Sequence, residues 1–199
     1  SPPPIERLGE EACQAIARYY DYDPTIPLEA RTVELKKDVD GLPREKIVFR
    51  GGAAQLVPAY LQVPQMEDGQ RAPCVLLLHG WSGAKDRWFM DGGYISGGNV
   101  RKALLEAGYA VLALDAQCHG DRISTNDFAP VNHYQAEGPH PRKGYLTQVE
   151  IYRQTVVDYR RAIDYLATRD DIDAERIGVI GYSMGGTQTF LLTGVEPRI

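Results

Sequence analysis

The fold of this chain is decided by the stretch Arg176-Ile177-Gly178-Val179-Ile180-Gly181-Tyr182-Ser183-Met184-Gly185-Gly186. Its first half is short, apolar and β-branched, which predicts a buried strand. A helix is expected to begin at Met184 and to continue through the apolar residues 190–192. The corner between them has the pattern Gly181-x-Ser183-x-Gly185. This pattern is typical of a nucleophile elbow, in which a serine stands on a strained strand-to-helix turn above a sheet.

The residues of the corner each have a physical role in this interpretation. Side chains at Gly181 and Gly185 would collide across so sharp a turn, so both positions favour a residue without a β-carbon. Gly186 would let the helix lie close to the sheet. Ser183 is a weak nucleophile that needs a neighbouring base. Because free N–H groups at a helix N-terminus favour negative charge, the N–H of Met184 is predicted to face the oxyanion of a reacting ester.

Two glycine-rich motifs of a different kind do not fit this corner. A phosphate-binding P-loop would need lysine where Thr187 follows Gly186, and a dinucleotide fingerprint would need a second glycine at Val179. A glycine-rich turn with an incidental serine is the remaining alternative. The strand before the corner and the apolar helix after it favour the nucleophile.

Composition limits the class of protein. The 199 residues suit a single domain, with 43% hydrophobic and 25% charged residues. A net charge of -5 without a basic run argues against nucleic acid as a partner. No apolar run approaches the roughly 20 residues that span a membrane, so no membrane partner is expected. Cys13, Cys74 and Cys118 are predicted to be buried free thiols, and the compartment, cytoplasmic or secreted, stays open.

The first part of the chain predicts an appendage and an antiparallel section. Residues 1–30 form an N-terminal extension, in which residues 5–20 have helical spacing and are expected to lie against the main domain. Pro24 and Pro27 end that helix. Residues 31–38, 46–50 and 55–63 alternate as strands, with a turn at residues 51–52.

The pattern changes after residue 73. Residues 74–78 and 109–114 are continuous apolar runs, as expected for strands buried on both faces of a sheet. Helices are predicted at residues 98–107 and 145–168, and this alternation favours parallel strands with right-handed crossovers. The fold class is therefore α/β, a mostly parallel doubly wound sheet with antiparallel N-terminal strands. The polar residues 121–144 are expected to form a cap over the active site.

A second oxyanion donor is expected from the loop after an earlier strand. That loop is His79-Gly80-Trp81-Ser82-Gly83, and the N–H of Trp81 is the candidate partner for that of Met184. Losing one such donor typically costs about 2.7–4 kcal/mol of transition-state stabilisation.

The four histidines carry no clear catalytic signal. His79 is interpreted as a hydrogen-bonder that shapes the oxyanion loop. His119 is disfavoured as the base, because this architecture orders its triad as serine, acid and then histidine. A metal site made by His119 with Asp115 or Asp121 has no specific spacing, so neither a metal nor another cofactor is predicted. The remaining two, His133 and His140, are expected to be solvated or to belong to the cap.

Taken together, these motifs resemble the α/β-hydrolase superfamily, and most closely its dienelactone-hydrolase-like and acetyl-xylan-esterase-like branch. The resemblance spans nearly the whole chain and implies that fold. Dienelactone hydrolases proper use a cysteine nucleophile, so Ser183 implies an esterase-type member. The residues that carry the resemblance are His79 to Asp86, Asp115 to Arg122, Gly181 to Gly186, and the lead-in from Tyr20 to Leu28.

The resemblance also implies a missing part. In this superfamily the triad acid and histidine lie on loops after later strands, and the sequence ends at Ile199. No residue of this chain can be assigned to either role by position. We therefore expect the chain to be the N-terminal part of a longer hydrolase, whose sheet and triad a second chain or further residues complete. The elbow strand is expected to keep an open edge, and the isolated unit to be inactive or nearly so.

The function expected from the resemblance is hydrolysis of a small-molecule carboxylic ester through an acyl-enzyme on Ser183, without a cofactor. Two alternatives stay open. A peptidase of the same superfamily would use the same nucleophile, and a non-catalytic binding or assembly module would keep the fold without the triad.

Overall fold

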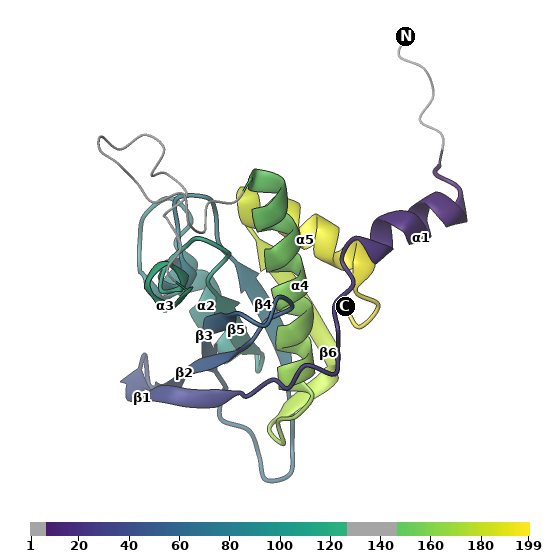
Figure 1. Cartoon of the computed structure of the whole chain (residues 1–199). Coiled ribbons are helices and arrows are strands. Elements are labelled where there is room, and N and C mark those ends of the chain that lie inside the picture. Colours follow the sequence, from purple (N-terminus) through teal and green to yellow (C-terminus); the bar gives the residue numbers. More distant parts are fainter. Residues whose placement is uncertain (1–6, 127–146) are drawn as a thin grey trace, which may run out of the picture.

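The computed structural model describes residues 7–126 and 147–199. Its centre is a six-stranded sheet with the order β1-β2-β3-β5-β4-β6 (Figure 1). β4, β5 and β6 are parallel, whereas β1, β2, β3 and β5 pair in antiparallel fashion. The predicted α/β class with an antiparallel N-terminal section is confirmed. The strands are β1 (Arg31–Val39), β2 (Leu42–Arg50), β3 (Leu56–Gln62), β4 (Ala72–Leu78), β5 (Ala110–Leu114) and β6 (Ile172–Gly181).

Helices cover both faces of the sheet. One face carries α4 (Gln148–Leu166) and α5 (Met184–Val195), and the other carries η1 (Lys85–Phe89) and α2 (Gly97–Glu106). Successive residues of β4 point to opposite faces, because side chains alternate along a strand. Leu76 accordingly packs in the core under α4 and α5, while Val75 and Leu77 pack with Trp88 on the opposite face. Both faces of β4 are buried, as the continuous apolar run predicts.

β6 is the edge strand of the described sheet. Ile172 and Ile177 are its buried residues, the others are half-buried or exposed, and Ile180 is 38% exposed. The expectation of a buried elbow strand is therefore wrong for much of β6, whereas the expected open edge is present in the described residues. Figure 1 shows β6 beside β4, with α5 following it.

The N-terminal helix differs from its prediction. α1 spans Glu10–Arg18 and has no buried residue, so it does not lie against the main domain. In Figure 1 it projects away from the sheet. Only the segment after α1 is attached: Tyr20 is buried, and Arg153 Nε donates to the Tyr19 carbonyl oxygen at 2.6 Å. Helical spacing shows which face is apolar but not whether anything covers it.

Several further boundaries and environments differ from expectation. A short helix, α3 (Arg122–Asn126), replaces the start of the predicted cap loop, and residues 127–144 of that loop lie outside the described residues. In the predicted helix 145–168, the apolar residue Val149 is exposed. Cys13 is exposed, so the prediction of a buried thiol is wrong there, whereas Cys74 and Cys118 are buried. No helix among the described residues is long and apolar enough to cross a membrane.

Candidate active site

Ser183 occupies a strained corner between β6 and α5. Its backbone angles are φ 52° and ψ -122°, in a region that residues other than glycine rarely adopt. The helix begins immediately after it, since Thr187 N–H donates to the Ser183 carbonyl oxygen at 3.2 Å. The Ser183 residue is exposed. The local geometry is that of the predicted elbow, and the role of Ser183 as nucleophile stays a prediction.

The glycines that flank Ser183 are required by close packing. A β-carbon on Gly181 would lie 2.3 Å from the carbonyl oxygen of Gly185, as expected for a collision across the turn. A β-carbon on Gly185 would lie 2.2 Å from the carbonyl oxygen of Leu78, at the end of β4. At Gly186 the nearest atom would be 3.6 Å away, an ordinary van der Waals contact. The close approach of helix to sheet therefore depends on Gly185. The expectation that it depends on Gly186 is wrong.

The predicted oxyanion loop lies against this elbow. A β-carbon on Gly80 would be 2.6 Å from the ring of Tyr182 and 3.3 Å from the β-carbon of Ser183. Met184 is the first residue of α5, where N–H groups have no acceptor within the helix. The two segments with the candidate donors, Trp81 and Met184, thus come from neighbouring loops. Their roles as oxyanion donors stay predictions.

His79 fixes the oxyanion loop through both ring nitrogens. Ala116 N–H donates to Nε2 at 3.0 Å, so Nδ1 carries the proton and donates to the Gly80 carbonyl oxygen at 2.8 Å. Burial lowers the pKa of His79 to about 3, and the neighbouring His119 adds to this shift. An imidazole that is neutral at pH 7 therefore joins the loop after β5 to the loop after β4, which agrees with the loop-shaping role expected for it.

His119 lies between two carbonyl groups. Its Nδ1 is 2.8 Å from the Gln117 oxygen and its Nε2 is 2.7 Å from the Trp81 oxygen. A neutral ring can donate to only one of them. Burial lowers the pKa of His119, although both hydrogen bonds oppose that shift. Because His79 and His119 direct all four ring nitrogens at backbone groups, neither is placed to deprotonate Ser183. His133 and His140 lie outside the described residues.

A buried ionic cluster supports the same two loops. Lys85 Nζ lies 2.7 Å from carboxylate oxygens of both Asp115 and Asp121. Asp115 also accepts hydrogen bonds from the backbone N–H groups of Lys85 and Asp121, each at 2.9 Å. Burial opposes the charge of Lys85, but the two carboxylates outweigh it and raise its pKa to about 12. The side chains of Lys85 and Asp115 are fully buried.

Sequence reasoning missed this cluster, although charged residues after two buried strands were a usable signal. Asp115 and Asp121 hold an ammonium group instead of the metal considered as an alternative. Within residues 7–126 and 147–199, no group of three or more His, Cys, Asp or Glu side chains is arranged to hold a metal ion.

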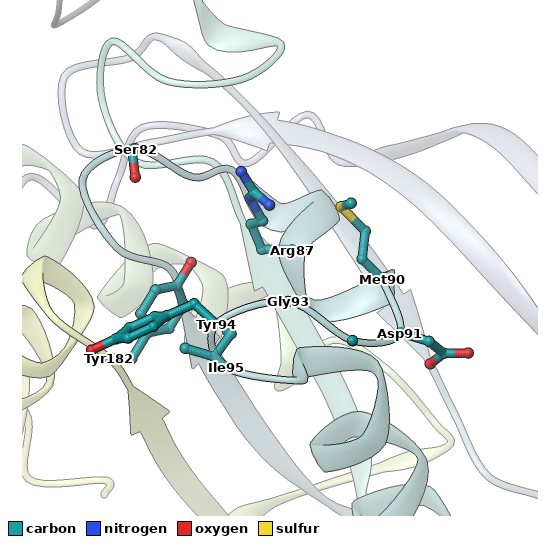
Figure 2. Close-up of a pocket in the computed structure, with 9 residues that line it drawn as sticks. Ser82, Arg87, Met90, Asp91, Gly93, Tyr94, Ile95 and Tyr182 are labelled. Atoms are coloured by element: carbon teal, nitrogen blue, oxygen red, sulfur yellow. The ribbon is translucent and has the colours of Figure 1, made fainter.

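A cavity of about 240 Å³ opens beside the elbow (Figure 2). Tyr182, the neighbour of Ser183, forms one wall, and Ser82 of the oxyanion loop contributes to the rim. The remaining lining residues belong to η1 or follow it, and they carry no motif that sequence reasoning could have recognised. They are Arg87, Met90, Asp91, Gly92, Gly93, Tyr94 and Ile95.

Comparisons with known proteins identify the family of the chain. The family model for acetyl xylan esterase (AXE1) matches residues 25–199. The protein YtaP of Bacillus subtilis (strain 168) is 27% identical over 177 residues, which cover 87% of this chain and 55% of YtaP. The chain thus spans about half the length of this relative.

Solved structures show the same fold. The acetyl xylan esterase from Paenibacillus sp. R4 is 24% identical with a TM-score of 0.59, over 94% of this chain and 54% of that enzyme. Acetyl xylan esterase 1 from Thermoanaerobacterium sp. JW/SL YS485 is 19% identical with a TM-score of 0.66, over 95% of this chain and 56% of that enzyme. These likenesses concern the fold of α/β-hydrolase esterases. Because the family model covers most of the sequence, the chain belongs to the acetyl xylan esterase (AXE1) family.

Proposed function

We propose that the full-length protein is a serine hydrolase that cleaves small carboxylic esters through an acyl-enzyme on Ser183. The observation that carries the proposal is the strained, exposed Ser183 at the N-terminus of α5, directly against the loop after β4. Family membership supports an ester as the substrate class. Strain of this kind is typical of functional sites, where the surrounding structure maintains it.

The reaction would proceed in two balanced steps. Ser183 Oγ attacks the ester carbonyl carbon, its proton passes to a base, and the carbonyl oxygen becomes an oxyanion that the N–H groups of Trp81 and Met184 stabilise. Collapse expels the alcohol, which takes up the proton. Water then attacks the acyl-enzyme in the same way, which releases the carboxylic acid and restores Ser183.

The base and its acid partner are proposed to lie outside this chain. Both described histidines are committed to backbone groups, and the chain spans only about half of its relatives. On this proposal the residues that complete the triad come from a further part of the protein or from a second chain. The 199-residue chain alone is then expected to show little activity.

The test is hydrolysis by the full-length protein of p-nitrophenyl acetate, acetylated xylo-oligosaccharides and a peptide p-nitroanilide. We expect ester hydrolysis that Ser183→Ala reduces by about 10³-fold or more, with little amide hydrolysis. Thr193→Ala, which removes an exposed hydroxyl near the end of α5, serves as the control and should retain most activity. Amide cleavage without ester cleavage would favour a peptidase. Undiminished activity of Ser183→Ala would refute the proposed nucleophile.

A further inference from the structure

The cavity beside the elbow carries a charge that the proposed reaction does not use. Arg87 lines it and is exposed, and it forms no ion pair with any residue in the described part of the chain. The acidic residue of the lining, Asp91, is neutralised elsewhere, since Lys102 Nζ lies 2.8 Å from its carboxylate. Arg87 is therefore the cation of this lining that has no acidic partner in the described part of the chain.

The backbone of Arg87 is held in place by its neighbours. Its N–H donates to the Ala84 carbonyl oxygen at 3.0 Å. A β-carbon on Gly97 would lie 2.4 Å from the Arg87 carbonyl oxygen, so α2 packs directly on this backbone. A β-carbon on Gly83 would lie 3.1 Å from Cγ of Arg87. Gly97 thus packs on the backbone of Arg87 and Gly83 on the start of its side chain, and the guanidinium group lies at the cavity.

The remaining polar groups of the lining are neutral donors or acceptors. In the view of Figure 2, the hydroxyl of Ser82 and the guanidinium of Arg87 lie along one rim, and the rings of Tyr94 and Tyr182 lie along another. Tyr94 is 95% exposed, so its ring stands at the mouth. Gly92 and Gly93 have φ angles of 73° and 77°, which form the tight turn between Met90 and Tyr94.

We propose that this cavity binds a carboxylate carried by the ester substrate, with Arg87 as its cation. A planar guanidinium group can hold a carboxylate through two parallel hydrogen bonds. The volume of about 240 Å³ suits a short substituent and not a polymer segment. Because Tyr182 joins the cavity to Ser183, the carboxylate and the scissile carbonyl belong to the same small molecule. This inference rests on the proposed esterase function and specifies the substrate class.

The experiment compares two esters with the same reacting group on the full-length protein. Mono-p-nitrophenyl adipate carries a free carboxylate on a chain long enough to avoid rapid self-cleavage, and its methyl ester is the neutral counterpart. We expect Arg87→Gln to lower kcat/KM for the anionic ester by about 10-fold or more, and that for the neutral ester by less than about 2-fold. Arg87→Lys should recover part of the preference for the anionic ester. It keeps the positive charge but loses the two parallel N–H donors of the guanidinium group. Arg18→Gln, on the projecting helix α1, is the matched control and should leave kcat/KM unchanged for both esters.

The outcomes separate this inference from the proposed function. An equal loss on both esters, or no loss on either, would overturn the carboxylate site while leaving the esterase intact. If neither ester is hydrolysed, the proposed function fails, and calorimetric binding of free adipate decides the inference by itself. Weaker adipate binding by Arg87→Gln than by the wild-type protein would support the site, and equal binding would overturn it.

Discussion

Gly185 lies so close to Leu78 that a β-carbon at position 185 would stand 2.2 Å from the Leu78 carbonyl oxygen. The contact joins the start of α5 to the end of β4, and so joins the candidate nucleophile to the loop with the candidate oxyanion donor. It also involves backbone atoms on the Leu78 side, which cannot rotate away as a flexible side chain could. The geometry of the candidate site therefore depends on one missing methyl group.

Gly185→Ala is expected to destabilise the protein by roughly 1–3 kcal/mol and to remove most esterase activity, because the helix must shift away from β4. Urea denaturation and initial rates measure the two effects. Gly194→Ala is the matched control in the same helix, since a β-carbon there has no neighbour within 4 Å. It should leave activity unchanged and add up to about 1 kcal/mol of stability. Equal behaviour of the two variants would contradict the importance of this contact.

The backbone strain at Ser183 gives a second prediction. Glycine adopts φ 52° and ψ -122° more readily than any residue with a β-carbon, so Ser183→Gly should be about 1 kcal/mol more stable than Ser183→Ala. Both variants should be inactive. The comparison of their urea midpoints isolates the strain, because both lack the hydroxyl group. An alanine variant as stable as the glycine variant would argue against strain at the elbow.

The buried ion pair of Lys85 and Asp115 gives a third prediction. Lys85→Met leaves the Asp115 carboxylate without its cation in the interior, and should lower the free energy of unfolding by about 3–5 kcal/mol. Asp115→Asn removes the buried charge, although its single oxygen replaces only one of the two carboxylate oxygens that accept from backbone N–H groups. We therefore expect the double variant to lose at least about 1 kcal/mol less than the sum of the single variants. Strict additivity in denaturant titrations would show that the two side chains do not interact.

Acid should destabilise the fold through His79. The pKa of His79 is about 3 in the folded protein against an ordinary value of 6.5, so between these two values only the unfolded chain takes up this proton. The contribution to stability is full above pH 6.5 and is lost as the pH falls toward 3. Between pH 7 and pH 5.5 the loss from His79 alone should be about 1.3 kcal/mol.

Denaturant titrations of the wild-type protein and of His79→Gln at both pH values measure this loss. His119, whose pKa is also lowered, adds to the loss in both proteins. The difference in the free energy of unfolding between the two pH values should be smaller in the variant by about 1.3 kcal/mol. An unchanged difference would contradict the neutral state of His79.

Features that depend on neighbouring residues in the sequence could be predicted, whereas features that depend on contacts between distant segments could not. The apolar runs at β4 and β5 and the corner at Ser183 are local patterns, and the structure places them as expected. The exposure of α1 and of Val149 could not be predicted, because it depends on what covers an apolar face.

Contacts between distant segments could not be predicted either. The contact of Lys85 with Asp115 and Asp121 spans two loops, and the charges become a cluster only once the sheet order brings those loops together. The same holds for Arg87, whose charge is notable only because its neighbour Asp91 is paired with Lys102. The sequence predicts that the helix needs a glycine to approach the sheet, yet the tight contact falls on Gly185 and not on Gly186, because only the β-carbon position of Gly185 faces the Leu78 carbonyl group.

Ser183 as an activated nucleophile in the complete protein is the centre of the proposed function. Labelling with a fluorophosphonate probe, followed by peptide mapping, tests it most directly, because the probe reacts with serines that a neighbouring base activates. We expect one adduct per molecule of the full-length protein, located on Ser183, with esterase activity lost in proportion. Ester hydrolysis that persists without labelling, or an adduct on another residue, would contradict this role.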